Sequence, residues 1–457
     1  MKIQILQPLV DKIKKQNPNI FKFITNTWWL SADYFFRLLL GLVVGAWVAR
    51  YLGPANYGKL TYAATFVAFF SGITKLGLDG ICVRNIIRYP DKTDDILGTS
   101  FILKIGSGVL TTLLSGLISY LLFPKDLLAT LMVVIISTGT LFFSFDVIDF
   151  WFQSNLQSRN TVLSKGTAYI IVASLRILFI LLKLPLIYFT LAILLENVVG
   201  ALFLLLAYRI SRRRVKQWTF SLNTARQLLA DSWPLVISGT LGLIYLHVDQ
   251  LLIKLFINDE SLGIYSVAVR LSEIWYFIPS AIVTSIFPII ISAKEKDEAD
   301  YQEKLQTLYD GVSWIAIIIA VVVTFLAAPL VNIIFGQEYQ AASSILAIYI
   351  WTGPFVFLGV ARSQWVLSEN RTKIPIITST MGAISGIILY LLLIPKIGGI
   401  GAAIGSVISY SVNTIIACFI YPPLYKTGLM LLKALFIPFR IKKNIQYFHK
   451  IKLLLTH

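Results

Sequence analysis

Hydrophobic residues along the chain come in long runs that short polar segments separate. The hydrocarbon core of a bilayer is about 30 Å thick and offers no water to backbone amides, so a crossing helix needs about 20 apolar residues. Twelve runs meet that length, and the pattern therefore predicts an all-α membrane protein of about 12 transmembrane helices. The predicted spans are 29–50, 57–77, 97–121, 127–150, 167–183, 186–208, 233–255, 262–291, 309–334, 341–366, 374–394 and 399–421.

Positively charged residues between the runs predict the orientation of the chain. Cytoplasmic loops carry an excess of Lys and Arg. With the N-terminus inside, 28 of the 40 Lys and Arg fall on the inner side. The outer side receives five, which are Arg50, Lys59, Lys125, Lys183 and Lys396. The distribution predicts that both the N-terminus and the C-terminus lie in the cytoplasm.

The longest inner loop, 209–231, has six predicted spans before it and six after it. It is strongly basic, and we interpret it as a linker between two six-helix bundles. No cleaved signal peptide is expected before the first span, because Lys12, Lys14 and Lys15 interrupt that stretch. The predicted parts are a cytoplasmic basic segment 1–28, a bundle 29–208, the linker 209–231, a bundle 232–421 and a cytoplasmic amphipathic basic tail 422–457.

Weak internal similarity supports a duplication of the bundle. Shifting the sequence by 205 positions places Gly58, near the start of the second span, over Gly263, near the start of the eighth. The same shift places Trp28 over Trp233. Since each half has an even number of spans, both halves enter the membrane from the same side. The two bundles are therefore expected to be related by a pseudo-two-fold axis along the membrane normal, with a cavity between them.

The composition agrees with a membrane protein and argues against nucleic-acid binding. The chain is 57% hydrophobic and only 14% charged, whereas soluble globular proteins carry roughly 25% charged residues. A net charge of +17 would suggest nucleic-acid binding in a soluble protein, but here the cations lie mostly between spans, so no nucleic acid is expected. Anionic lipids of the inner leaflet are the expected partners of the basic tail, and a solvated tail is the alternative.

Several short motifs, in order along the chain, resemble the polysaccharide-exporter branch of the MOP superfamily, the Wzx-type O-antigen flippases with a MATE-like fold. Multidrug extruders and lipid II flippases are more distant relatives of that branch. The motifs are Ala49-Arg50-Tyr51-Leu52-Gly53-Pro54-Ala55-Asn56-Tyr57-Gly58, Leu76-Gly77-Leu78-Asp79 with Arg84, Asp149-Phe150-Trp151-Phe152-Gln153, Phe287-Pro288, Phe335-Gly336 with Tyr339 and Ala342, and Ile394-Pro395-Lys396-Ile397-Gly398-Gly399-Ile400-Gly401-Ala402-Ala403.

The resemblance implies a membrane transporter that is not an enzyme. It implies alternating access and the movement of a polyprenyl-pyrophosphate-linked oligosaccharide from the cytoplasmic to the outer leaflet of a bacterial inner membrane. The expected setting is cell-surface polysaccharide biosynthesis, with a polysaccharide polymerase and glycosyltransferases as further partners. No cofactor is expected.

Arginines deep inside the predicted spans are the candidates for binding such a cargo. A charge at mid-bilayer is costly and normally faces a cavity or a partner, and guanidinium groups bind phosphate oxygens in a bidentate manner. Arg37 and Arg270 are the first candidates, and Arg176 is the next. The alternative for Arg37 and Arg270 is an ion pair within one helix, with Asp33 at i−4 and Glu273 at i+3. Lys75, Lys104, Lys254 and Arg362 lie closer to span ends, where long side chains can reach the headgroups.

Acidic residues inside the spans are candidates for binding a coupling ion. They could take up H⁺ or Na⁺ during the transport cycle. The candidates are Glu273, Asp249, Glu196 and Asp33.

Signatures of enzymes are missing from the sequence. No Walker loop, HExxH motif or paired zinc-binding Cys motif occurs, so neither ATP-driven pumping nor a metal centre is expected. Two alternatives remain beside the flippase. One is an integral-membrane glycosyltransferase, a polymerase or ligase of the same pathway, although the predicted outer loops are short for a catalytic domain. The other is a multidrug extruder of the same superfamily, for which the deep arginines are poorly suited.

Overall fold

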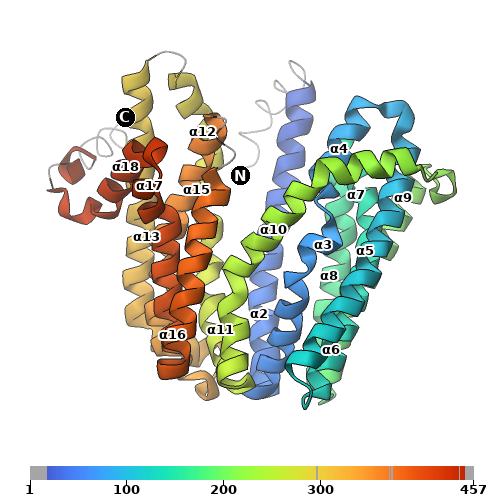
Figure 1. Cartoon of the computed structure of the whole chain (residues 1–457), viewed down its shortest axis with the longest axis horizontal. Helices are drawn as coiled ribbons and strands as arrows, with labels where there is room; N and C mark the ends of the chain where they lie inside the picture. Colours follow the sequence, from blue (N-terminus) through green and yellow to red (C-terminus); the bar gives the residue numbers. More distant parts are fainter. Residues whose placement is uncertain (1–17, 295–296, 370, 372–373, 442, 448–457) are drawn as a thin grey trace, which may run out of the picture. The chain divides into compact units, whose positions relative to one another are not determined.

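Helices make up almost all of the protein that the computed structural model describes, which is residues 18–294, 297–369, 371, 374–441 and 443–447. No strand occurs within these ranges, as Figure 1 shows. Parts of the predicted basic segment 1–28 and of the predicted tail 422–457 lie outside the described residues, namely 1–17, 442 and 448–457.

The chain divides into two compact units. Unit 1 contains Met1–Leu52 and Tyr62–Thr240, and unit 2 contains Gly53–Thr61 and Leu241–His457. The boundary therefore falls inside a helix and not in the predicted linker 209–231. A short piece of the N-terminal half, residues 53–61, packs with the C-terminal half. The five-part division made from the sequence stays a prediction.

Unit 1 is a bundle of long helices whose apolar residues pack around buried aromatic rings. Phe150, Trp151 and Tyr208 belong to its core, and α8 packs along α9. Its elements are α2 (Pro18–Phe69, of which 53–61 belong to unit 2), α3 (Ser71–Lys75), α4 (Leu78–Arg88), η1 (Pro90–Lys92), α5 (Thr93–Leu122), α6 (Leu127–Thr138), η2 (Gly139–Phe145), α7 (Asp146–Ser154), α8 (Ser158–Leu181), α9 (Leu186–Ile210), η3 (Val215–Gln217) and the first part of α10 (Leu222–Phe256).

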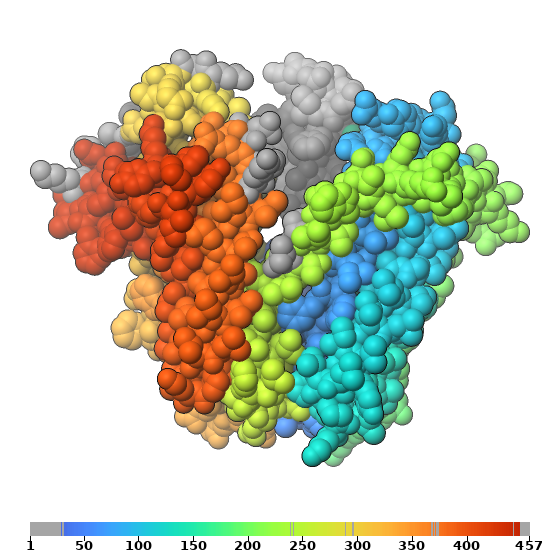
Figure 2. All heavy atoms as spheres, in the orientation of Figure 1, coloured from blue at the N-terminus to red at the C-terminus, as the bar shows by residue number. Residues whose placement is uncertain are grey.

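The first part of α10 lies on the surface of unit 1, where it forms the light green band in Figure 2. Two polar contacts hold it there. Thr224 Oγ1 donates a hydrogen bond to Asp95 of α5, and Asp231 pairs with Arg84 of α4. Close packing adds to this, since a Cβ on Gly77 would lie 2.7 Å from Cβ of Leu235. The basic linker is thus continuous with a helix that is fixed to unit 1.

Unit 2 is a second helical bundle with its own core, which includes Tyr309, Phe357 and Leu431. Side-chain caps begin two of its helices: Asn258 accepts from Ser261 N, and Asp297 accepts from Ala299 N and Asp300 N. Its remaining elements are α11 (Asp259–Glu273), η4 (Ile274–Tyr276), α12 (Phe277–Lys294), α13 (Glu298–Ile334), η5 (Gln337–Tyr339), α14 (Ala342–Tyr349), α15 (Thr352–Ser368), α16 (Ile374–Ser411), the π-helical turn η6 (Val412–Ile416), α17 (Ala417–Ile420), η7 (Pro422–Leu424), α18 (Tyr425–Leu435) and η8 (Ile437–Phe439).

The C-terminal amphipathic segment docks onto unit 2. Leu431 and Ile437 are fully buried, and α18 packs against α13. Asp310 of α13 accepts from Arg440 at 3.0 Å and from Tyr447 OH at 2.8 Å. One side of this segment therefore packs on protein, whereas Phe436 and Phe439 remain exposed. The lipid-bound and the solvated alternatives for the tail both stay predictions.

Two glycines with positive φ interrupt the two longest apolar helices. Gly53 (φ 70°) breaks α2, and Gly398 (φ 61°) breaks α16. Among the described residues, nine helices are long and apolar enough to cross a membrane, or ten if the bent α10 counts as one. Each glycine lies between two of the spans predicted from the sequence. The count of twelve stays a prediction, and it requires each broken helix to cross twice.

Lys104, Lys254 and Arg362 were expected to reach the headgroups from span ends, and this expectation was wrong. Lys104, Lys254 and Arg362 are buried in the protein, with 1%, 6% and 6% of their surface exposed. Lys104 Nζ lies over the Phe150 ring at 4.8 Å, and Lys254 pairs with Asp259 at 2.7 Å. Distance from a span end does not show which way a side chain points, so depth alone could not separate these residues from headgroup-facing ones.

Candidate functional site: a charged cavity in unit 1 and a polar cluster in unit 2

A small cavity of about 110 Å³ lies inside unit 1, between α2, η2, α7, α8 and α9. Its wall combines apolar rings with charged and amide groups, which is unusual for the middle of apolar helices. Buried polar groups of this kind need partners, because an unpaired charge away from water is strongly unfavourable. The lining residues are Arg37, Phe142, Phe143, Asp146, Lys165, Ala168, Glu196, Asn197, Gly200, Ala201 and Leu204.

Arg37 enters this cavity from α2. Its Nε donates to both carboxylate oxygens of Asp33 at 2.9 Å, one turn earlier on the helix. The guanidinium carbon lies 5.2 Å from the centre of the Tyr169 ring. Nη2 of Arg37 is buried and has no hydrogen-bond partner within the described part of the chain. The intrahelical pair predicted as an alternative therefore exists, and it leaves one donor of the guanidinium unused.

A second predicted cation pairs across two helices at the same cavity. Arg176 of α8 donates to Glu196 of α9 at 2.9 Å, and Glu196 itself lines the cavity. Neither side chain is fully buried, with 19% and 27% exposed. This pair is consistent with the packing of α8 along α9, and it connects two sequence candidates that the hydrophobic pattern could not link.

Lys165 is a cavity residue that the sequence reasoning missed. Its Nζ lies 2.8 Å from Asp146 and 3.6 Å from Asp149, so one ammonium holds two carboxylates of α7. Thr161, one turn before Lys165, donates to Asp149 at 2.7 Å. The predicted fifth span began after Lys165, which assigned this residue to a loop. The helix actually begins at Ser158, and the polar Thr161 and Lys165 on one face were the available signal.

Asp249 is the centre of a buried polar cluster in unit 2. It is 2% exposed and accepts a hydrogen bond from Tyr265 OH. Ser406 of α16 donates to it at 3.5 Å and also contacts Tyr390 OH at 3.1 Å. These contacts join α10, α11 and α16 around one carboxylate, so a change in its charge would act on three helices at once.

Arg270 and Glu273 lie near the end of α11 in the same unit. Arg270 Nη1 donates to Tyr57 OH at 3.1 Å, and Tyr57 is 5% exposed. The Tyr57 ring meets Tyr339 edge-on, with 6.3 Å between centroids. The Glu273 carboxylate interacts electrostatically with both Asp249 and Arg270. Arg270 therefore connects the Gly53–Thr61 segment to the acidic part of unit 2.

The seven residues predicted from the sequence thus fall into two groups. Unit 1 brings together Asp33, Arg37, Arg176 and Glu196, and unit 2 brings together Asp249, Arg270 and Glu273. Within the described residues, no group of three or more His, Cys, Asp or Glu side chains could hold a metal ion. Their assignment to cargo and to coupling ion stays a proposal.

Known proteins resemble this chain in fold and in part of its sequence. The "Probable low-salt glycan biosynthesis flippase Agl15" of Haloferax volcanii is 22% identical over 227 residues, which are 49% of this chain and 48% of that protein. The match thus spans about half the length of this relative. The lipid II flippase MurJ, in an inward closed conformation, aligns with a TM-score of 0.67 at 19% identity, over 91% of this chain and 92% of that one. An inward-facing MATE multidrug resistance transporter of the MOP superfamily aligns with a TM-score of 0.69 at 16% identity, over 86% and 96%.

The two structural likenesses show the fold, and they confirm the all-α membrane architecture expected from the hydrophobic pattern. The chain is a multi-pass membrane protein by its apolar helices and its fold. The family model described as "Polysaccharide biosynthesis protein" matches residues 23–294, more than half of the 457 residues. The chain belongs to the polysaccharide biosynthesis protein family.

Proposed function

We propose that the protein is a flippase for a polyprenyl-pyrophosphate-linked oligosaccharide and that it moves this lipid from the cytoplasmic to the outer leaflet. The observation that carries the proposal is the charged cavity of unit 1, in a chain of the polysaccharide biosynthesis family. The unused Nη2 donor of Arg37 supports a role in binding an anion there. The glycan flippase of H. volcanii and the fold of the lipid II flippase agree with this class of cargo.

The cargo chemistry fits an arginine site. A pyrophosphate must leave water to cross the bilayer, and a guanidinium stays charged and donates to two phosphate oxygens at once. In the proposed cycle, the cavity side chains exchange their internal ion pairs for contacts with the pyrophosphate. Arg176 would then release Glu196, and Arg37 would use its free Nη2 before it gives up Asp33. Arg270 is a further candidate for binding the pyrophosphate, in unit 2.

Ion coupling is a second part of the proposal. Asp249 and Glu273 in unit 2, with Glu196 and Asp33 in unit 1, are the groups we propose to exchange H⁺ or Na⁺ during the cycle. The buried contacts of Asp249 with Tyr265 and Ser406 support this choice. Protonation or Na⁺ binding would neutralise a carboxylate that three helices surround.

We place the protein in the cytoplasmic membrane, the inner membrane of a bacterium, with both termini inside. The 28 inner against five outer Lys and Arg support this orientation. The same family and fold support a transporter role in place of an enzymatic one. A polysaccharide polymerase and glycosyltransferases are the proposed neighbours in the pathway, and they would consume and supply the lipid-linked glycan.

A flipping assay on the purified protein tests the proposal. Proteoliposomes that contain a labelled polyprenyl-diphosphate disaccharide report transfer between leaflets as a gain in accessibility to an added glycosidase. We expect Arg37→Ala to slow transfer about 10-fold to 100-fold, since a hydrogen bond to a charged group contributes about 1.5–3 kcal/mol. Arg37→Lys should retain more activity if charge dominates, and equal loss would indicate bidentate geometry.

The control is Arg226→Ala, which removes an exposed cation from the surface part of α10. Normal transfer by Arg37→Ala, or equal loss in both variants, would overturn the role of the cavity. Glycosyl transfer by the purified wild-type protein from a lipid-linked donor would replace the flippase by the glycosyltransferase alternative.

A further inference from the structure

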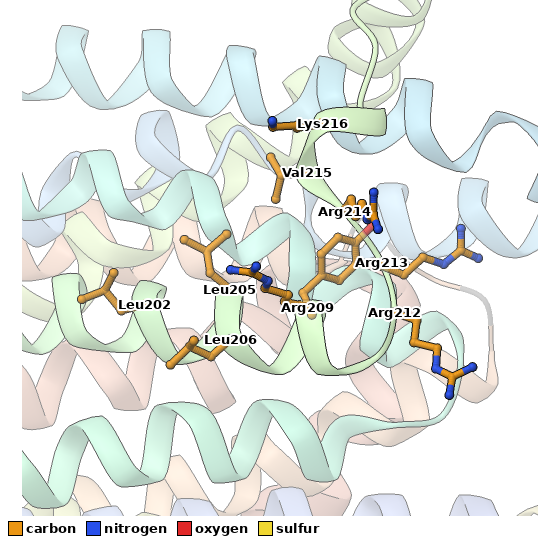
Figure 3. A pocket seen from close by; sticks show the side chains of 10 residues that line it. Leu202, Leu205, Leu206, Arg209, Arg212, Arg213, Arg214, Val215 and Lys216 are labelled. Carbon is orange, nitrogen blue, oxygen red and sulfur yellow. The ribbon is translucent and has the colours of Figure 1, made fainter.

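A groove at the end of α9 has features that the flippase proposal does not use. Its volume is about 1070 Å³, almost ten times that of the unit 1 cavity. Figure 3 shows that its wall comes from the last turns of α9 and from the chain that follows, up to η3. The lining residues are Leu202, Leu205, Leu206, Tyr208, Arg209, Arg212, Arg213, Arg214, Val215 and Lys216.

The groove changes from apolar to basic along its length. Leu202 and Leu206, one turn apart on α9, are 54% and 53% exposed, so they present an apolar surface where the span faces the lipid. All five charged residues of the lining are cations and follow Leu206 in the sequence, which places them toward the end of the span. A phospholipid has the same lengthwise order, with acyl chains in the bilayer core and phosphate at its surface.

The backbone at the end of α9 gathers the cations. Arg212 has a positive φ of 59°, and Arg213 N donates to Tyr208 O, which reverses the chain direction as in a Schellman ending. The residues after the turn therefore fold back toward the helix end. Their positive charge also lies at the helix C-terminus, where the macrodipole favours cations.

None of the five cations has an ion-pair partner in the described part of the chain. The cations at the unit 1 cavity behave differently: Arg37, Lys165 and Arg176 all pair with carboxylates. The Arg213 guanidinium is held 5.4 Å from the centre of the Trp151 ring. Trp151 packs edge-on against Tyr208, and both rings belong to the buried core of unit 1, so Arg213 rests on a rigid support. The groove is thus basic, and none of its five cations forms an ion pair within the described residues.

We propose that this groove binds a lipid whose headgroup carries two phosphate groups, in the cytoplasmic leaflet. Two linked or neighbouring phosphates offer more acceptor oxygens and more negative charge than one phosphate does, which suits a cluster of five cations. The leucines cover the first part of the hydrocarbon chains. Two lipids share this chemistry, the polyprenyl diphosphate carrier and a diphosphatidylglycerol. The proposal goes beyond the flippase function, because the groove is separate from the unit 1 cavity and its lipid binding can be measured without transport.

Native mass spectrometry of the purified protein tests the inference by counting bound lipids. The probes are a polyprenyl diphosphate, diphosphatidylglycerol, and phosphatidylglycerol with its single phosphate. The variant is Arg209→Gln with Arg214→Gln, because neither side chain has an ion pair that the fold could lose. The matched control is Arg88→Gln with Arg226→Gln, which removes the same charge from two exposed positions of unit 1 outside the groove.

We expect the groove variant to bind both diphosphate lipids about 30-fold more weakly than wild type, since each basic residue contributes about 1 kcal/mol near anionic lipid. The control variant should keep wild-type affinity. Stronger binding of the polyprenyl diphosphate would identify the groove as a docking site for the cargo, and stronger binding of diphosphatidylglycerol would identify a resident lipid site. Equal binding of phosphatidylglycerol and the diphosphate lipids, or equal weakening in groove and control variants, would overturn the proposal. Loss of flipping with intact lipid binding would count against the flippase function alone.

Discussion

Gly58 and Gly263 allow two backbones to cross at very short range in unit 2. A Cβ added to Gly58 would lie 1.8 Å from the carbonyl oxygen of Asp259, and one added to Gly263 would lie 2.0 Å from that of Pro54. The same shift of 205 positions relates Gly58 to Gly263 and Pro54 to Asp259. The crossing is therefore symmetric, as an isologous contact between two copies of one motif would be.

The size of the expected effect of Gly58→Ala follows from these distances. Ordinary van der Waals contacts of a Cβ are 3.4–4 Å, so the helices must separate by about 1.5 Å to admit one methyl group. Both obstacles are backbone atoms and cannot rotate away. We expect a cost of about 3 kcal/mol from overpacking, offset by up to about 1 kcal/mol because alanine favours a helix more than glycine does. The net loss of about 2 kcal/mol corresponds to a fall in Tm of about 4–8 °C for a unit of this size.

Thermal unfolding of the detergent-solubilised protein measures this shift. Gly311→Ala is the matched control, because a Cβ at Gly311 of α13 would have no heavy atom within 4 Å. That variant should keep or slightly raise the Tm. The double variant Gly58→Ala with Gly263→Ala should cost less than the sum of the single variants, because a crossing opened by one methyl admits the second. Unfolding of Gly58→Ala at the same temperature as Gly311→Ala would refute the close approach, and additive losses would refute the shared crossing.

Three further outcomes are expected. Arg362→Ala should destabilise unit 2 by about 2–5 kcal/mol in the same thermal assay. The guanidinium donates to the carbonyls of Asn413 and Thr414 in the π-helical turn, and these carbonyls would lose a buried partner. An unchanged Tm would contradict this. Asp249→Asn should abolish flipping driven by an imposed H⁺ or Na⁺ gradient and retain exchange of cargo without a gradient, whereas retained gradient-driven flipping would exclude Asp249 as the coupling site. Burial raises the pKa of the Cys82 thiol to about 11, so roughly 0.1% of it is thiolate at pH 8. Maleimide labelling of Cys82 in the folded Cys418→Ser variant should therefore be slow at pH 8 and faster as the pH rises toward 11. Rapid labelling at pH 8 would contradict the buried position.

The deep arginines show which contacts helix spacing can predict and which contacts it cannot. The spacing of Asp33 and Arg37 allowed their pair to be predicted, because residues four apart share a helix face whatever the rest of the chain does. The same reasoning offered Glu273 as a partner for Arg270, but it could not predict the hydrogen bond from Arg270 to Tyr57, 213 positions earlier in the chain. Contacts between residues so far apart in the chain depend on which helices pack together, and the order of apolar and polar residues does not show this.

Other features of this protein divide in the same way. The hydrophobic pattern was enough to predict the all-α membrane class and the positions of most helices, since a bilayer requires long apolar runs whose backbone groups bond internally. The weak repeat also pointed to Gly58 and Gly263 before their contact was known. The folded chain was needed to show that residues 53–61 pack with unit 2, that Lys165 bridges Asp146 and Asp149, and that the cations after α9 line one groove. These features arise from packing between helices and from one turn of the backbone at Arg212, and hydropathy measures neither of them.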